Sequence, residues 1–230
     1  MKIFNRKNLI STSLIAILIG ATVLAGCSSS NGNKSSKVAA NQVKNSDKSA
    51  TVTDKDTDGD GIPDEAEKLL GTNPYAADSN GDGVSDKLDK NPNYTPNPIK
   101  ETKTVILPVK IKDIRVQDNV NATDHLEITL SNTGKVDLKN FDCYFTEVDA
   151  VTKAKEGYYV KLTGFTLETG STKTLHFDNK SAELHYNGNM NGIYGTSKNE
   201  VVFMGQIHAT DYAPLDFSVK KDKGTAEVAD

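Results

Sequence analysis

An acidic segment punctuated by glycine constrains this chain more than any other feature of the sequence. Residues 56–67 read DTDGDGIPDEAE and hold six carboxylates around two glycines. The wider stretch 54–89 carries eleven acidic residues and three lysines. Burying a carboxylate is costly unless a cation or hydrogen-bond donors partner it. The segment therefore either stays solvated or folds around a cation.

The spacing of these carboxylates matches a calcium loop, D-x-[DN]-x-[DN]-G-x5-E. Alternate residues of a tight loop can direct oxygens at one centre, with position 7 acting through its backbone carbonyl and position 9 often through water. Gly61 at position 6 permits the sharp turn. The first loop would bind Ca²⁺ through Asp56, Asp58, Asp60, Ile62, Asp64 and Glu67.

A second copy of the pattern begins 22 residues later, which an acidic solvated linker would not be expected to produce in register. Asp89 at its position 12 is one methylene shorter than Glu67, so closure of this site by Asp89, directly or through water, stays open. The first loop has five carboxylates and the second has four, so we expect two Ca²⁺ sites with the first the tighter. The second set of ligands is Asp78, Asn80, Asp82, Val84, Asp86 and Asp89.

The surroundings of the loops indicate which kind of calcium loop they are. An EF-hand needs a helix before each loop, whereas GTNPYAA before the second loop is a turn. DEAEKLLG after the first loop predicts a short helix that ends at Gly71. The stretch DTDGDGIPDEAEKLLGTNPYAADSNGDGVSDKLDKNPN resembles the thrombospondin type 3 repeats of bacterial surface proteins. The resemblance implies paired calcium loops over residues 54–93 with one or two short helices.

The N-terminus is typical of an export signal, because a basic start precedes the apolar run LISTSLIAILIGATVLAG. A retained transmembrane helix is the alternative, since this run could just span a bilayer. The sequence Leu24-Ala25-Gly26-Cys27 resembles the lipobox of bacterial lipoproteins. The resemblance implies removal of residues 1–26, lipid on Cys27, and an extracytoplasmic protein anchored to the cell membrane at the bacterial surface.

Three polar segments divide the rest of the chain. Residues 27–53 are rich in Ser, Asn and Lys, which predicts a disordered N-terminal stalk. Residues 94–101 carry two prolines and are expected to form an extended linker. Residues 221–230 form a polar tail. Because the linker would separate the calcium loops from the C-terminal part of the chain, we expect calcium removal to leave that part unaffected.

Residues 102–220 alternate apolar and polar side chains in short runs, as in HLEITLS, YYVKLTG, KTLHFD and PLDFSVK. Such runs, separated by turn residues, predict a mainly β fold with a C-terminal antiparallel β-sandwich. Pro108 predicts an edge strand, and Cys143 is expected to pack in the core between Phe141 and Phe145. The run LEITLSNTGKVDLKNFDCYFTEV resembles the immunoglobulin-like modules of bacterial surface proteins, which implies a scaffold or binding module.

Catalytic motifs such as G-x-S-x-G, H-E-x-x-H and the P-loop are missing from the sequence, so we expect no enzyme. A glycosidase pair among the scattered acids cannot be recognised from spacing. The four histidines are expected to be solvated or locally hydrogen-bonded. The sequence has no basic patch, so nucleic acid is not an expected partner.

Two classes of function stay open. The first is a lipid-anchored calcium-binding protein whose β-sandwich acts as a surface binding or adhesion module for a protein or glycan partner, and it is the one we favour. The second is a structural or accessory lipoprotein that docks onto a cell-envelope assembly without a ligand of its own. A hydrolase accessory on the secreted side is a third, weaker alternative.

Overall fold

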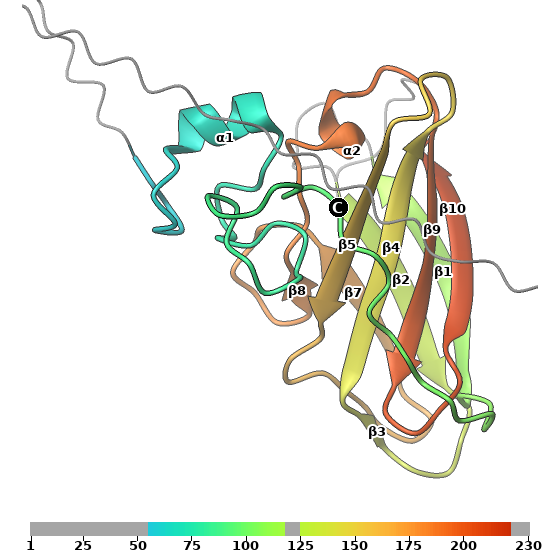
Figure 1. The fold of residues 1–230 in the computed structure, drawn as a ribbon. Helices are drawn as coiled ribbons and strands as arrows, with labels where there is room; N and C mark the ends of the chain where they lie inside the picture. The colour runs from blue at the N-terminus through green and yellow to red at the C-terminus, as the bar shows by residue number, and fades with distance from the viewer. Residues whose placement is uncertain (1–54, 118–124, 222–230) are drawn as a thin grey trace, which may run out of the picture. The chain divides into compact units, whose positions relative to one another are not determined.

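The computed structural model describes residues 55–117 and 125–221 (Figure 1). Most of the regular structure in these residues is β-strand, so the predicted mainly β class is confirmed. The elements in chain order are α1 (Asp64–Leu70), β1 (Val109–Gln117), β2 (His125–Asn132), β3 (Leu138–Lys139), β4 (Phe141–Asp149), β5 (Lys155–Lys161), β6 (Thr166–Leu167), β7 (Thr172–Phe177), β8 (His185–Tyr186), α2 (Ile193–Thr196), β9 (Val201–Ala209) and β10 (Leu215–Lys221).

Two four-stranded sheets make up the C-terminal part of the chain. Their strand orders are β1-β2-β7-β8 and β10-β9-β4-β5, and β3 pairs with β6 in a small third sheet. Antiparallel pairing joins all of these neighbours except β7 and β8, which run parallel. The antiparallel sheets that the period-2 runs predict are therefore confirmed, with one short parallel pair that they do not predict.

The core lies between the two large sheets (Figure 1). Leu126, Ile128 and Leu130 of β2, which share the apolar phase of their run, are all buried. Phe145 of β4 meets Phe177 of β7 with ring centroids 5.6 Å apart and the rings nearly perpendicular. This edge-to-face arrangement is favourable for aromatic pairs. The alternating pattern thus identifies the buried face of both sheets correctly.

Two single-residue predictions about the β part are also confirmed. Pro108 directly precedes β1, an edge strand whose neighbour among the described strands is β2. Its carbonyl accepts a hydrogen bond from the backbone N–H of Thr133 (2.9 Å), while proline has no backbone N–H to donate in return. Cys143 is a free, fully buried thiol in β4, and this burial raises its pKa.

The calcium segment, residues 55–93, contains a single helix. Helix α1 follows Pro63, carries acidic residues in its first turn, and stops at Gly71, whose φ of 77° is left-handed. The N–H of Gly71 donates to the carbonyl of Glu67 (2.8 Å). Glycine adopts this C-cap conformation without a steric penalty. The predicted helix and its glycine stop are confirmed, and residues 71–93 form turns.

Asparagine side chains join the calcium segment to the sheets. Asn189 donates from Nδ2 to the carbonyl of Gly71 (2.7 Å), and Asn191 donates from Nδ2 to the carbonyl of Thr72 (2.8 Å). Asn73 in turn donates to a carbonyl in the segment between β8 and α2 (3.3 Å). Asn189 and Asn191 come from that same segment, so it forms the surface on which the Gly-Thr-Asn-Pro turn rests.

The segment 94–101, predicted to be a linker, is extended but lies against β5. The N–H of Thr95 donates to the carbonyl of Gly157 (3.0 Å), and the N–H of Gly157 donates to the carbonyl of Asn93 (3.1 Å). The hydroxyl of Tyr144 also donates to the carbonyl of Thr95 (3.1 Å). These bonds cover a sheet edge that would otherwise be open. We expected the calcium loops and the C-terminal sheets to be independent of each other, and these contacts do not agree with that expectation. The predicted domain boundaries stay predictions.

Other predictions lie outside the described residues. They are the signal peptide over 1–26, the lipid on Cys27, the stalk that runs to residue 53, and most of the tail over 221–230. Neither helix in the part of the chain that the structure describes has the length and apolar character needed to cross a membrane.

Candidate metal centre

The two predicted calcium loops share one hydrogen-bond framework. In the first loop both oxygens of Asp56 accept backbone N–H groups, from Gly59 (2.8 Å) and Gly61 (3.0 Å). In the second loop both oxygens of Asp78 do the same, from Gly81 (2.8 Å) and Gly83 (2.7 Å). The aspartate at position 1 thus curls each loop onto itself. The two copies seen in the sequence are therefore folded in the same way.

Positions 3 and 5 repeat the agreement between the loops. One oxygen of Asp58 accepts the N–H of Asp60 (3.1 Å), and one oxygen of Asp60 accepts the N–H of Ile62 (2.6 Å). Asn80 and Asp82 make the equivalent bonds in the second loop, at 2.9 Å each. These local bonds fix the side chains at positions 3 and 5, and the second oxygen of Asp60 also accepts the N–H of Lys87 from the second loop (3.2 Å).

The first loop brings three carboxylates together. Asp56, Asp58 and Asp60 each offer an oxygen, and these oxygens lie within 4.8 Å of one another. Oδ2 of Asp58 is buried without a hydrogen-bond partner, and burial is the main cause that raises the pKa of this carboxyl group. A buried oxygen without a donor is costly, and a divalent cation would supply the missing partner.

Glu67 at position 12 provides the strongest sign of a cation site. Its side chain extends from α1 and is fully buried. Oε1 accepts a long bond from the hydroxyl of Thr72 (3.4 Å), whereas Oε2 has no partner. Burial, with added repulsion from Asp58 and Asp60, raises the pKa of Glu67 to about 7. The first loop therefore fits a Ca²⁺ ion, which prefers carboxylate oxygens of this kind.

Position 9 has the same role in both loops, and this role differs from that of positions 1, 3 and 5. Asp64 accepts hydrogen bonds from the backbone N–H (2.8 Å) and the hydroxyl (2.7 Å) of Thr57. Asp86 accepts the same pair of bonds from Ser79, at 2.8 and 2.6 Å. Both residues thus tie position 9 to position 2 and leave fewer oxygens for direct contact with a cation. This arrangement suits the expectation that position 9 acts through water.

Position 12 is where the two loops differ. Asp89 in the second loop is half-buried and uses both carboxylate oxygens within the protein. Oδ2 accepts a bond from Nδ2 of Asn80 (2.8 Å), and Oδ1 accepts the N–H of Asn91 (2.9 Å). No oxygen of Asp89 is left buried and unpartnered as Oε2 of Glu67 is. The two loops therefore differ at position 12, where Glu67 has a buried oxygen without a partner and both oxygens of Asp89 accept hydrogen bonds.

Glycine at position 4 is a functional residue that the sequence reading missed. Gly59 and Gly81 have φ of +79° and +77°, and the position 6 glycines Gly61 and Gly83 have +91° and +95°. L residues with side chains rarely adopt this region. The signal was present in the sequence, because the run D-x-[DN]-G-D-G occurs in both loops.

Gly81 has a second role that Gly59 lacks. The second loop approaches β5 so closely that the carbonyl of Asn80 accepts the N–H of Tyr159 (2.9 Å). A Cβ atom on Gly81 would overlap the carbonyl oxygen of Tyr159, whereas a Cβ on Gly59 would meet nothing within 4 Å. Sequence reasoning could not identify Tyr159 as a partner of the loop, since no local pattern marks it.

We expect Gly81→Ala to destabilise the protein more than Gly59→Ala. Both variants force alanine into the left-handed region, at a cost of about 1–2 kcal/mol. Only Gly81→Ala also pushes the loop away from β5. Urea unfolding of both variants in saturating calcium measures the difference. Equal destabilisation would show that the contact with Tyr159 contributes nothing.

The histidines that the structure describes pair with carboxylates, which agrees with the expectation of locally hydrogen-bonded roles. Nδ1 of His208 lies 2.8 Å from Asp142, and Nδ1 of His185 lies 2.9 Å from Asp178. His176 stacks on His185 with ring centroids 4.6 Å apart. The side chain of His125 lies outside the described residues.

One buried acid pair was not expected from the sequence. Glu147 on β4 is opposite Glu156 on β5, and burial together with Glu156 raises the pKa of Glu147 well above its usual range. Each carboxylate accepts a backbone N–H of α2, from Tyr194 (3.0 Å) and from Ile193 (2.7 Å). These bonds give the pair a structural role in holding the short helix. The expectation that the chain is not an enzyme stays a prediction.

Comparison with known families bears on the first loop. The model of the bacterial TSP3 repeat matches residues 56–76, which comprise the first loop, α1 and the start of the turn after it. A search of curated proteins finds no match. The chain therefore carries a bacterial TSP3 repeat, which indicates a calcium-binding extracellular protein.

Proposed function

We propose that this chain is a lipid-anchored, extracytoplasmic calcium-binding protein whose β-sandwich acts as a surface binding or adhesion module of immunoglobulin-like type. The observation that carries the calcium role is the buried, unpartnered oxygen of Glu67 beside the clustered carboxylates of Asp56, Asp58 and Asp60. Two loops with the same framework support two Ca²⁺ ions per chain. Calcium would then neutralise the most acidic part of the molecule.

The binding role draws support from the way in which the calcium segment meets the sandwich. The second loop bonds to Tyr159, and the segment around Thr95 covers Gly157 on the same strand. A cation in the loops would therefore fix the surface along β5. A structural lipoprotein without a ligand of its own would not need a calcium-dependent surface at this edge.

The calcium part of the proposal is tested by calorimetry on the full chain. Two Ca²⁺ ions should bind, with dissociation constants near the 10⁻⁴–10⁻³ M that is typical of extracellular modules. Absence of calcium heat would overturn the proposal. A stoichiometric complex with an envelope assembly that forms equally well in chelator would favour the accessory role instead.

Lipid attachment has its own test. Labelled palmitate should be incorporated into the chain, and Cys27→Ala should abolish the label, because the thioether sulfur would be lost. Cys143→Ala is the matched control: it removes the other cysteine of the chain, which is buried in the core, and should keep the label. Membrane retention and normal processing of the Cys27→Ala variant would contradict the anchor.

A further inference from the structure

Three asparagine side chains clamp the C-terminal end of α1. The carbonyls of Leu70, Gly71 and Thr72 each accept a hydrogen bond from an asparagine Nδ2. The donors are, in the same order, Asn93 (3.1 Å), Asn189 (2.7 Å) and Asn191 (2.8 Å). The last carbonyls of a helix have no partners within the helix. These asparagines therefore supply the missing partners and fix the place where α1 ends.

The clamped residues are the ones that hold Glu67. The carbonyl of Glu67 accepts the N–H groups of Gly71 (2.8 Å) and Thr72 (3.0 Å), and its Oε1 accepts the hydroxyl of Thr72 (3.4 Å). Oε2 of the same side chain is the buried oxygen without a hydrogen-bond partner. Because both the backbone and the side chain of Glu67 are tied to Gly71 and Thr72, the position of these two residues sets the position of the carboxylate.

The segment 187–192, between β8 and α2, provides two of the three clamping asparagines and is itself held firmly. A Cβ atom on Gly188 would overlap the carbonyl oxygen of Phe177 in β7. A Cβ atom on Gly192 would overlap Oε2 of Glu156 in β5. The two strands belong to different sheets. The segment therefore packs closely on both sheets and forms a firm base for α1.

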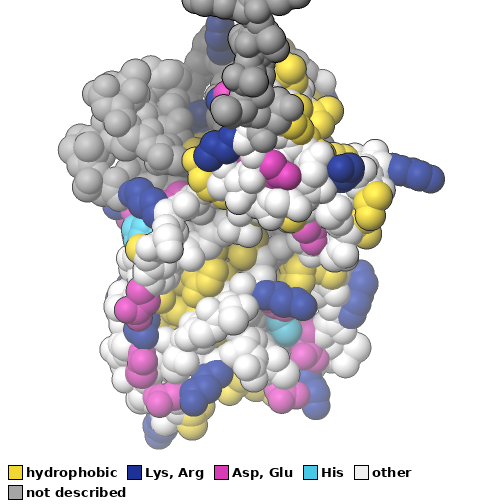
Figure 2. All heavy atoms as spheres, turned by 90° about the vertical axis from the view of Figure 1, so that its left-hand side faces the viewer, with side chains coloured by type: hydrophobic (Ala, Val, Ile, Leu, Met, Phe, Trp, Pro, Cys, Tyr) yellow, Lys and Arg dark blue, Asp and Glu magenta, His cyan; other side chains and the backbone are white. Residues whose placement is uncertain are grey.

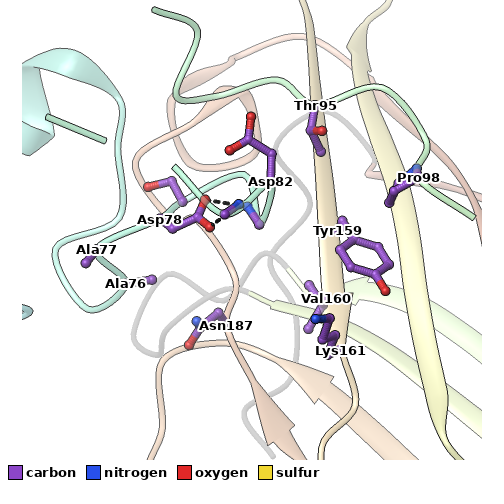
Figure 3. Close-up of a pocket in the computed structure, with 13 residues that line it drawn as sticks. Ala76, Ala77, Asp78, Asp82, Thr95, Pro98, Tyr159, Val160, Lys161 and Asn187 are labelled. Carbon is purple, nitrogen blue, oxygen red and sulfur yellow. Dashed lines mark hydrogen bonds between the residues drawn. The ribbon is translucent and has the colours of Figure 1, made fainter. Parts of the chain in front are cut away.

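Apolar packing does little to hold α1 on the sandwich. Among the seven described residues of α1, Glu67 alone is buried, and the side chains of Leu69 and Leu70 are exposed. Figure 2, which views the molecule from the left-hand side of Figure 1, shows a face of mostly polar surface with charged side chains of both signs. Asn187 and Asp78 line a cleft of about 640 Å³ where the second loop approaches β5 (Figure 3). The contacts that position α1 on the sandwich are therefore chiefly hydrogen bonds.

Asn189 is buried and extends the clamp toward α2. Its Nδ2 also donates to the hydroxyl oxygen of Tyr158 (3.1 Å), and this hydroxyl donates to Oε2 of Glu156 (2.7 Å). The same Oε2 accepts the N–H of Ile193, the first residue of α2 (2.7 Å). A continuous series of hydrogen bonds therefore joins Gly71 at the end of α1 to the start of α2.

We propose that Asn189 is a positioning residue for the first calcium loop, through which the sandwich holds Glu67 in place by way of Gly71. The inference rests on the proposed calcium-binding function and adds the residue by which the sandwich sets the affinity of that site. Coupling between two sites is reciprocal, so calcium at the first loop should also stabilise the bond to Ile193. The match to the bacterial TSP3 repeat ends at residue 76 and includes none of the clamping asparagines.

The test measures calcium affinity at the first loop of the full chain, by following the amide signal of Gly61 by NMR during a calcium titration. Asn189→Ala removes the donor to Gly71. It should weaken binding by about fivefold, less than the ~10–100-fold lost with a residue that bonds directly to a metal ligand, because Asn189 acts through Gly71. Asn191→Ala removes the donor to Thr72 and should weaken binding in the same direction, so it provides the measurement if Asn189→Ala does not fold.

Asn199→Ala is the matched control. Nδ2 of Asn199 donates to Asp149 of β4 (3.0 Å) and not to the calcium segment, so this variant should bind calcium as the parent does. Thermal unfolding in chelator measures the stability that each variant loses. A purely structural role of Asn189 would lower the melting temperature and leave the calcium affinity of the folded protein unchanged, which would overturn the inference.

Hydrogen exchange tests the reciprocal effect. Calcium should slow exchange of the Ile193 amide in the parent, and this response should disappear in Asn189→Ala. An Ile193 amide that responds equally in both proteins would also overturn the inference. If the parent bound no calcium, the proposed function would fail and the inference with it. Normal binding by the parent together with normal affinity of folded Asn189→Ala would reject the inference alone.

Discussion

Removing calcium at neutral pH is expected to abolish hydrogen-exchange protection across residues 55–95 and to extend the loss to the amides of Gly157 and Tyr159 in β5. These two amides donate to the carbonyls of Asn93 and Asn80 (3.1 and 2.9 Å), which belong to the calcium segment. If the segment opens, both amides lose their acceptors. The effect of calcium should therefore reach the sandwich, although the prolines at 96 and 98 suggested a separating linker.

The physical reason is that the calcium segment has almost no core of its own. Leu69, Leu70 and Leu88 are all exposed, at 90%, 56% and 76%. Ala76 is the one buried apolar side chain among the described residues of the segment. Burial this small cannot offset about 1–2 kcal/mol of backbone entropy per ordered residue. Without a cation, repulsion among the carboxylates opposes folding further.

Strand β9 provides the internal control for this experiment. It lies between β10 and β4 and does not touch the calcium segment through any backbone bond among the described residues. Its amides should stay protected in chelator. If protection were lost only in residues 55–93 and Gly157 and Tyr159 stayed protected, the calcium segment and the sandwich would be independent of each other. Loss across β9 would mean that calcium holds the whole sandwich together.

The sequence predicts the elements well because each depends on local chemistry. Period-2 runs locate the strands, the position of Pro108 identifies an edge strand, and Gly71 ends α1. The calcium loops follow from spacing alone, since the hydrogen bonds that curl each loop join residues close together in the chain. Such signals require no knowledge of the partner strand.

The docking of the calcium segment could not be predicted in the same way. It depends on Asn189 and Asn191, whose acceptors Gly71 and Thr72 lie more than a hundred residues away in the chain. Asparagine in a polar loop predicts a turn, not a specific partner. These long-range contacts therefore appear only once the fold places the segment between β8 and α2 beside the turn after α1.

Strand β4 shows a related limit of pattern reading. Glu147 falls on the phase of Phe145, which is the core phase, yet it is a buried acid that accepts the N–H of Tyr194. Tyr144 falls on the opposite phase and is buried too, because its hydroxyl bonds to Thr95 as the chain crosses the outer face. Alternation assumes one solvated face, and here a second layer covers part of it.

Glu67→Gln is expected to weaken calcium binding at the first loop by at least about 100-fold. The loss of a residue that only hydrogen-bonds to a metal ligand typically weakens metal binding by about 10–100-fold, so the effect at Glu67 should be larger. The amide keeps the volume of the side chain and its contact with Thr72, but it removes the charge of the one closing carboxylate whose oxygen is buried and unpartnered. Glu65→Gln is the matched control. Glu65 lies on the same helix, is exposed, and pairs with Lys68 at 2.7 Å, so its loss should leave affinity unchanged.

The pH dependence of the parent protein tests the same group independently. Because the pKa of Glu67 is raised to about 7, a proton competes with the cation, and calcium affinity should fall as pH decreases through 7. The raised pKa also means that the folded, calcium-free protein binds this proton more tightly than the unfolded chain does. Stability without calcium should therefore decline as pH rises from about 4.5 through 7.

Calorimetry at pH 6 and pH 8 on the parent and on Glu67→Gln distinguishes this role from a structural one. The parent should show a change in affinity between the two values and proton release on binding, and the variant should lose both effects at the first loop. A variant that binds calcium weakly but keeps the full pH dependence would place the titrating group elsewhere among the carboxylates. If Glu65→Gln weakened binding as much as Glu67→Gln, the closing role of Glu67 would be wrong, because the helix charge as a whole would then control the site.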